Sequence, residues 1–276
     1  LQKVTLASTG YVEEPEALPI RDAKATGTAF DDVVGKQCKT VDISGMFNSD
    51  VTDIFKNKYL SPRSPYTTLA LPTQGIGDWC STKRTANIDD SGIRNSAVGG
   101  VFTAAGVPFS TPQTGKNIVY TSLWDNYPDS VTIPLKGRGS HVYLLMAGST
   151  NPMQSHFENG VVSIEYADGT MEQLQLTNPY NWCPIEQDYD DDGLAFNLPH
   201  PRPYRVGLKT GRVSRTLAID LGVKRVGKIF DNPGSKVPAM NIDGGAAQLL
   251  DIRINPKKKL KSLKLRTTAN DVVIGL

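Results

Sequence analysis

Two pairs of carboxylates in this chain could carry acid–base chemistry. Glu186 and Asp188 lie in one acidic stretch, and Asp89 and Asp90 are adjacent in another. A pair of carboxylates hydrolyses a glycosidic bond when one protonates the leaving oxygen and the other acts as nucleophile or base, at a separation of about 5 to 9.5 Å. Because the sequence defines no distance, the four residues are candidates for the catalytic acid and base of a glycoside hydrolase.

Aromatic and amide side chains gather in the loops between expected strands. Aromatic faces can stack on the C–H surfaces of sugars while polar side chains bond their hydroxyl groups, so these residue types predict a carbohydrate-binding surface. Its candidate residues are Trp124, Asp125, Asn126, Tyr127, His156 and Trp182. Asp and Asn also cap turns, and tryptophan also anchors cores, so structural roles stay open for the same residues.

A run of aspartates that begins at Asp188 resembles a calcium loop. Asp188, Asp190 and Asp192 are followed by Gly193, as at the start of an EF-hand loop, where alternate carboxylates converge on one Ca²⁺ ion. The twelfth position is Pro199 rather than the bidentate Glu of that motif. A calcium site and a solvated acidic loop are therefore the two interpretations.

The cysteines form no metal or nucleophile motif. Cys38, Cys80 and Cys183 are far apart and lack the CxxC spacing of zinc sites. The three histidines of the chain likewise show no HxH or HExxH spacing, which favours structural roles. We expect three buried thiols, with one disulfide plus a free thiol as the alternative.

Bulk composition excludes two kinds of partner. The 276 residues carry 30 basic and 28 acidic side chains, a net charge of +2, so no overall field favours nucleic acid. The lysine-rich stretch 257–261 leads into leucine–lysine alternation, as on the solvent face of a strand. A run of about 18 apolar residues is absent, so we expect no spanning helix and no membrane partner.

Short β-type runs separated by turn residues make up most of the chain. Runs of this length without helical periodicity predict an all-β sandwich or barrel. Asp168-Gly169 between two such runs predicts a hairpin, because Gly tolerates positive φ in a primed turn. Strands are expected at residues 118–123, 131–135, 141–147, 161–166, 171–176, 204–208, 216–221, 247–254, 262–267 and 272–276.

The chain divides into an N-terminal arm and one large domain. Residues 1–40 are polar without a period and predict an extended arm, while residues 41–276 are expected to form the sandwich. A glycine-rich, loop-like insertion is expected at 69–112. Apolar residues of 43–59 fall roughly on one helical face, and the Asn, Ser and Asp before Val51 offer an N-cap for a shorter helix.

Four long phrases resemble a known family. They are PTQGIGDWCS from Pro72, TSLWDNYPD from Thr121, LLMAGSTNPMQSHFENG from Leu144 and NPYNWCPIEQDY from Asn178. They are similar to the C-terminal β-sandwich region of large Bacteroidetes proteins in which a six-hairpin helical barrel of glycosidase type comes first. Many of those proteins belong to a domain-of-unknown-function family of polysaccharide-utilisation systems. The ending LKSLKLRTTANDVVIGL also resembles the last strands of galactose-binding-like jelly rolls.

The resemblance implies a jelly-roll, galactose-binding-like β-sandwich with long loops and one or two short helices, in a secreted, periplasmic or cell-surface protein. The helical barrel that would hold the catalytic acids is not part of this chain, which begins at Leu1 without an initiator Met and is expected to be a mature or excised piece. We therefore expect an ancillary domain that supports such a barrel and binds carbohydrate. The alternatives are a glycoside hydrolase in its own right and a purely structural docking module with an exposed apolar patch.

Overall fold

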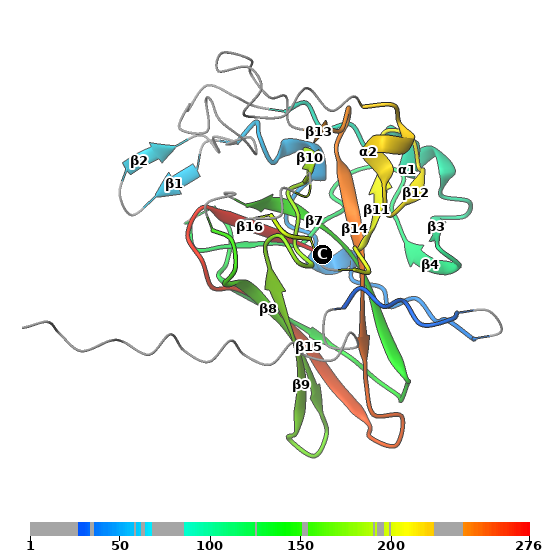
Figure 1. The fold of residues 1–276 in the computed structure, drawn as a ribbon. Helices are drawn as coiled ribbons and strands as arrows, with labels where there is room; N and C mark the ends of the chain where they lie inside the picture. Colours follow the sequence, from blue (N-terminus) through cyan, green and yellow to red (C-terminus); the bar gives the residue numbers. More distant parts are fainter. Residues whose placement is uncertain are drawn as a thin grey trace, which may run out of the picture.

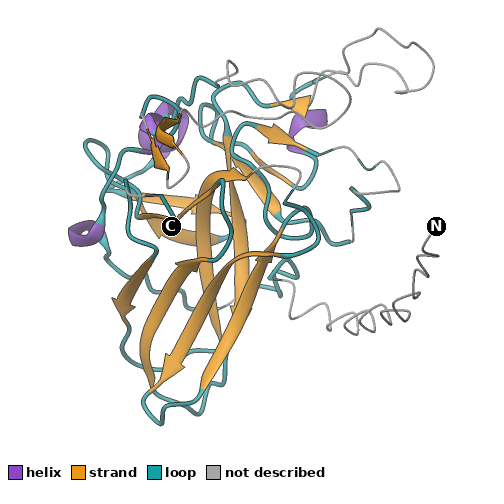
Figure 2. Ribbon diagram, turned by 90° about the vertical axis from the view of Figure 1, so that its left-hand side faces the viewer, coloured by secondary structure: helices purple, strands orange, loops and turns teal. Residues whose placement is uncertain are grey.

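The computed structural model contains a β-sandwich built from two antiparallel sheets (Figures 1 and 2). Strands make up most of the regular structure and both α-helices are short, so the prediction of an all-β sandwich with long loops and short helices is confirmed. The structure describes residues 27–33, 36–57, 59–61, 64–67, 86–124, 126–150, 154–189, 191, 196–198, 200–223 and 240–276.

The larger sheet has six strands. Its order is β12-β11-β14-β7-β16-β5, and every neighbouring pair is antiparallel. The long central strand β7 pairs with β14 along its first part and with β16 along its last part. The strands are β5 (Tyr120–Ser122), β7 (His141–Thr150), β11 (Tyr204–Gly207), β12 (Val213–Ser214), β14 (Ala246–Arg253) and β16 (Val272–Gly275).

The smaller sheet has four strands in the order β6-β15-β8-β9. β8 and β9 form the predicted hairpin, in which Gly169 takes a φ of +82°. In β15, Leu263 and Leu265 are buried while Lys261 and Lys264 are exposed, and Lys261 Nζ lies 2.6 Å from Glu165 Oε1 of β8. The strands are β6 (Ser130–Pro134), β8 (Glu158–Tyr166), β9 (Met171–Thr177) and β15 (Leu260–Thr267).

Two apolar cores lie on opposite faces of the larger sheet, because successive side chains of a strand point to opposite faces. Leu144 and Met146 of β7 belong to the core between the sheets, which includes side chains from both. Ala147 of β7 and Val273 of β16 belong to the core on the outer face. The central strands are therefore covered on both sides.

Short elements supply the outer core. The helix α1 (Ser91–Ser96) and the hairpin of β3 (Val101–Ala104) and β4 (Val107–Ser110) contribute Ile93 and Phe102. The insertion expected as a loop thus forms a helix and a hairpin in its described part. Two further antiparallel pairs are β1 (Tyr59–Ser61) with β2 (Ser64–Thr67), and β10 (Gln187–Asp188) with β13 (Met240–Asn241).

Two predictions of secondary structure were wrong. The expected α-helix within 43–59 is replaced by two 3₁₀ turns, η2 (Ser44–Met46) and η3 (Val51–Asp53). The cap was predicted correctly, because the Asp50 carboxylate accepts the Thr52 N–H at 2.9 Å. Residues 216–221, expected as a strand, contain the helix α2 (Leu217–Asp220). A short apolar run does not distinguish a strand from a buried helix by its periodicity.

The described part of the expected N-terminal arm contacts the sandwich. The Gly27 carbonyl accepts the N–H of Asp251 in β14 at 2.8 Å, and the Asp251 carboxylate accepts the Phe30 N–H at 3.1 Å. Asp31 Oδ2 also lies 3.0 Å from His141 Nε2 at the start of β7. These contacts hold residues 27–33 beside the two central strands of the larger sheet.

Candidate functional site

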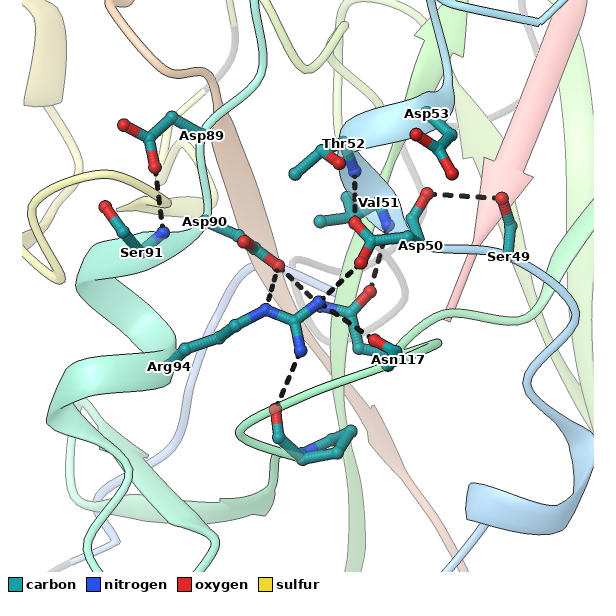
Figure 3. Close-up of polar contacts among 12 residues, drawn as sticks. Ser49, Asp50, Val51, Thr52, Asp53, Asp89, Asp90, Ser91, Arg94 and Asn117 are labelled. Atoms are coloured by element: carbon teal, nitrogen blue, oxygen red, sulfur yellow. Dashed lines mark hydrogen bonds and ion pairs between the residues drawn. The ribbon is translucent and has the colours of Figure 1, made fainter.

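An arginine on α1 joins two aspartates of the outer loops (Figure 3). Arg94 Nε lies 2.7 Å from Asp90 Oδ2, and its Nη2 lies 2.7 Å from Asp50 Oδ2. Asp90 directly precedes α1, and Asp50 caps η3. The Arg94 and Asp90 side chains are only 13% and 10% exposed, so water screens this ion pair weakly.

Asn117 completes the arrangement. Its Nδ2 donates to Asp90 Oδ2 at 2.7 Å, and its Oδ1 accepts the Val51 N–H at 2.9 Å. The guanidinium also donates to two backbone carbonyls of the 112–115 loop. The aspartate–arginine network consists of Asp50, Asp90, Arg94 and Asn117. The network holds η3, α1 and this loop together. The Asp90 carboxylate takes part through its bonds to Arg94 and Asn117.

Asp89 has a different partner from its neighbour in the sequence. Its Oδ1 accepts the Ser91 N–H at 3.0 Å, and hydrogen bonds from Ser91, together with the more distant charge of Lys209, lower the pKa of Asp89. Figure 3 shows Asp89 directed toward Ser91 while Asp90 is directed toward Arg94. The proposed acid–base pair is thus divided between a turn cap and the aspartate–arginine network.

The second carboxylate pair lies in a buried polar cluster around β10 and β11. Arg205 Nη1 is 3.3 Å from Asp188 Oδ1, and both side chains are at most 5% exposed. Asp188 Oδ2 accepts the Ala218 N–H of α2 at 3.0 Å. We call this group the Arg205 cluster; it consists of Cys183, Glu186, Asp188, Tyr189 and Arg205. Asp188 therefore connects β11 to α2 through its two oxygens.

Glu186 has a pKa near neutrality, which suits a group that transfers a proton. Burial raises its pKa to about 7, against smaller opposing effects that include the Gln187 amide and the Arg205 charge. Gln187 Nε2 donates to Glu186 Oε1 at 3.2 Å, and Oε2 has no hydrogen-bond partner among the described residues. A carboxyl group with this pKa can donate a proton near neutrality, but Glu186 is only 5% exposed.

Burial also favours the neutral forms of the thiol and the phenol of this cluster. Burial raises the pKa of the Cys183 thiol, and it raises the pKa of the Tyr189 hydroxyl well above its usual value. Cys183 is a free thiol, as predicted, and Cys38 is a free, half-buried thiol; Cys80 lies outside the described residues. Arg205 and Asp188 form the ion pair of the cluster.

The Glu186→Gln variant should lose the pH dependence that this carboxyl group imposes on stability. A native pKa of about 7 lies above the unfolded value, so the stability that Glu186 contributes is present at low pH and is lost as pH rises from about 4.5 through 7. The wild type should lose roughly 2 to 3 kcal/mol of unfolding free energy over this range through Glu186. Glu186→Gln should be more stable than wild type at high pH.

Urea unfolding at about pH 5 and pH 8 measures this difference. The matched control is Glu165→Gln, the same chemical change at a partly exposed carboxylate whose pKa is lowered by hydrogen bonding to Lys261. In the Glu165→Gln control, the unfolding free energy should still fall as pH rises, as it does in the wild type. Identical pH profiles for wild type and Glu186→Gln would show that Glu186 is not protonated in the native protein.

The described residues contain no group of three His, Cys, Asp or Glu side chains that could hold a metal ion. Of the three proposed calcium ligands, Asp190 and Asp192 lie outside the described residues. Asp188 faces Arg205 and the α2 backbone, and the positive charge of Arg205 disfavours a second cation beside it. Asp188 thus has structural contacts in the described part of the chain, and the calcium loop stays a prediction.

The two tryptophans proposed to bind sugar are core residues. Trp124 belongs to the core on the outer face of the larger sheet, and Trp182 is fully buried in the core between the sheets. A sugar ring cannot reach either indole face, so the prediction that they stack on carbohydrate is wrong for this structure. Their alternative role as core anchors is the one observed.

The remaining sugar-binding candidates lie in separate places. Asp125 is outside the described residues, Asn126 is exposed, and Tyr127 is half-buried. The Tyr127 hydroxyl accepts a hydrogen bond from Asn57 Nδ2 at 2.9 Å and lies 3.3 Å from Ser49 Oγ. Tyr127 therefore fixes the loop that follows η3.

His156 belongs to an exposed aromatic group that the sequence reasoning missed. His156 Nδ1 lies 2.7 Å from the Tyr180 hydroxyl, and the two rings meet edge to face at 5.2 Å. Phe157 is 47% exposed and Tyr180 37%. The exposed aromatic group consists of His156, Phe157 and Tyr180. In the sequence, Phe157 follows His156 and Tyr180 follows Pro179 in two separate loops. Nothing in either loop alone indicates that the two loops meet.

Among the described residues, no helix has the length and apolar character needed to cross a bilayer. Comparison of the chain with protein-family models and with curated proteins found no match in either case. The case for a function therefore depends on the geometry of these sites and on the sequence phrases described above.

Proposed function

We propose that this chain is a non-catalytic, ancillary β-sandwich of a multidomain glycan-degrading protein, which supports a helical-barrel catalytic domain and contacts carbohydrate. The observation that carries the non-catalytic part is the state of the four candidate carboxylates. Asp89, Asp90 and Asp188 are each hydrogen-bonded within the protein. Glu186 is buried. Glycoside hydrolysis needs two carboxylates that reach the glycosidic bond, and a buried or internally bonded carboxylate is poorly suited to that role.

The resemblance of the sequence phrases supports the glycan context. The exposed aromatic group is the described surface best suited to contact a sugar, because Phe157 and Tyr180 offer ring faces and His156 and Tyr180 offer polar atoms. Sugar binding through such a small platform is expected to be weak. The catalytic partner would then supply most of the specificity.

Calorimetry and product chromatography with a panel of plant and host glycans test this proposal on the full chain. We expect heat of binding without hydrolysis products for at least one glycan. The double variant Phe157→Ala/Tyr180→Ala should weaken that binding about tenfold or more, because each ring contributes stacking area. Met171→Ala is the control, since Met171 is also exposed and apolar but lies at the opposite end of β9. The absence of any glycan binding would remove the carbohydrate part of the proposal.

A glycoside hydrolase is the second candidate, and one observation favours it. Glu186 has a pKa of about 7, as a general acid requires. Product formation that is lost in Glu186→Gln while the protein stays folded would establish catalysis and overturn the non-catalytic proposal. Product formation that persists in this variant would place the chemistry elsewhere.

A further inference from the structure

The central strand β7 lies between β14 and β16 in the larger sheet (Figure 1). A cavity of about 560 Å³ lies along an open edge of this strand. β7 pairs with β14 over His141–Met146, but its pairing with β16 begins only at Ala147. On the side away from β14, the first part of β7 therefore has no ladder partner among the described strands. Residues 141–147 all line the cavity.

The cavity walls are mainly apolar. Ile133, Leu144, Met146 and Leu263 line it from the core between the sheets. The segment 36–41 lines it from outside the strands. Protein interiors leave few voids larger than a water molecule, whereas small-molecule sites measure about 300 to 1,000 Å³ and are mostly apolar. The volume and lining of this cavity match the second class.

The exposed charged side chains that line the cavity are all basic. Lys36, Lys39, Lys136 and Arg138 are exposed lining residues. Among the described residues that line the cavity, the one carboxylate is that of Asp90, which is already bound within the aspartate–arginine network. An apolar interior with a cationic rim is complementary to a molecule with an apolar body and one anionic group.

Two nearby carboxylates, Asp31 and Asp42, do not line the cavity. Asp31 is paired with His141, and Asp42 accepts the Ser44 N–H at 2.8 Å. Arg138 Nε donates to the Lys257 carbonyl at 3.3 Å, which orients the guanidinium without neutralising it. Among the described residues that line the cavity, basic side chains therefore outnumber the single carboxylate.

We propose that this cavity binds an anionic amphiphile, with the apolar chain against the apolar walls that reach into the core between the sheets and the anionic head beside Lys136 and Arg138. An alkyl chain is favoured over a peptide strand, because the space reaches into the core between the sheets. There the polar backbone of a peptide would lose water without gaining partners on every side. An alkyl chain has no polar group to desolvate. This site is independent of the proposed function.

Binding of dodecanoate to the full chain, measured by calorimetry below its micelle concentration, tests the proposal. Monolaurin and dodecyltrimethylammonium carry chains of the same length with a neutral and a cationic head. We expect dodecanoate to bind most tightly and the cation most weakly. Equal affinity for all three, or no binding of dodecanoate, would overturn the proposal.

Charge-reversal variants locate the head group. Lys136→Glu/Arg138→Glu should weaken dodecanoate binding about tenfold or more and should leave monolaurin binding nearly unchanged. Lys264→Glu/Arg266→Glu is the matched control, because it also reverses the charge of one lysine and one arginine. Both residues are exposed on β15 and do not line the cavity. Equal losses in both double variants would show that overall charge, and not this rim, attracts the ligand.

Two further measurements locate the alkyl chain. The free thiol of Cys38 lines the cavity, so dodecanoate should slow its alkylation, followed by mass spectrometry of the peptide that contains it. Val142→Trp should fill part of the space beside β7 and abolish binding of all three probes. Unchanged Cys38 reactivity with dodecanoate bound would place the ligand elsewhere. An extended apolar peptide that protects Cys38 when dodecanoate does not would replace the amphiphile by a strand-forming partner.

Discussion

Replacement of Arg94 by methionine is expected to lower the free energy of unfolding by about 3 kcal/mol or more. The guanidinium contacts Asp90 and Asp50 at 2.7 Å each and reaches two carbonyls of the 112–115 loop. Methionine keeps much of the side-chain volume but leaves the carboxylate of Asp90 buried and without its cation. The loss of an ion from a buried pair is costly because the remaining charge stays desolvated.

Urea unfolding of Arg94→Met, followed by far-UV circular dichroism, measures this loss. Lys209→Met is the matched control, because Lys209 Nζ also lies 2.6 Å from a carboxylate, that of Asp243, but both groups are largely exposed. The control should cost less than about 1 kcal/mol. Arg94→Met/Asp90→Asn should recover part of the loss, because it removes the unpaired charge. Equal effects of the two single variants would show that burial adds nothing to the Arg94 contacts.

The β-sandwich could be predicted from the sequence because its strands carry local signals. β15 alternates leucine with lysine, and the hairpin of β8 and β9 carries the Asp168-Gly169 turn. The hairpin of β3 and β4 has its turn at Ala105 and Gly106, both with positive φ. Alanine at the first of these positions is not a turn signal, and this hairpin was missed. The sequence thus predicted the hairpin with the common Asp-Gly turn and missed the hairpin with the unusual Ala-Gly turn.

The two elements predicted wrongly owe their conformation to contacts with distant residues. α2 begins where the Asp188 carboxylate accepts the Ala218 N–H, across thirty positions of sequence. At η3, the Asn117 side chain accepts the Val51 N–H, which fixes the first turn from a loop far along the chain. These contacts with distant residues cannot be seen in a window of a few residues. The prediction at both segments therefore depended on hydrophobic periodicity alone.

The candidate site was predicted as residue types and not as an arrangement. Glu186 and Asp188 were named as candidate catalytic residues from their types, but Arg205 of β11, which lies 3.3 Å from Asp188, was not foreseen. Arg94 carried a usable signal, since it stands four positions after Asp90, the spacing of helical ion pairs. The tryptophans were misassigned because burial depends on tertiary packing, and a Trp in a polar loop sequence can still turn inward, as Trp182 does.

Replacement of Trp182 by alanine is expected to cost about 3 to 5 kcal/mol of unfolding free energy, the range for removal of a large buried aromatic side chain. Trp182 is fully buried in the core between the sheets. Its ring lies over Gly148 of β7, where an added Cβ would come within 2.8 Å of Trp182 Cζ2. The close approach shows that the strand and the indole are fitted to each other, so a cavity left by alanine could not be closed by side chains of β7 alone.

Two further variants separate this structural role from sugar binding. Trp182→Phe should cost much less than alanine, because it keeps a ring in the core and removes an indole Nε1 that has no partner among the described residues. Tyr180→Ala, two positions away and exposed, should change stability by less than about 1 kcal/mol. If glycan binding occurs, it should survive in Trp182→Phe and weaken in Tyr180→Ala. Binding that is lost in Trp182→Phe and kept in Tyr180→Ala would mean that the indole is accessible in solution and that Trp182 contacts the sugar.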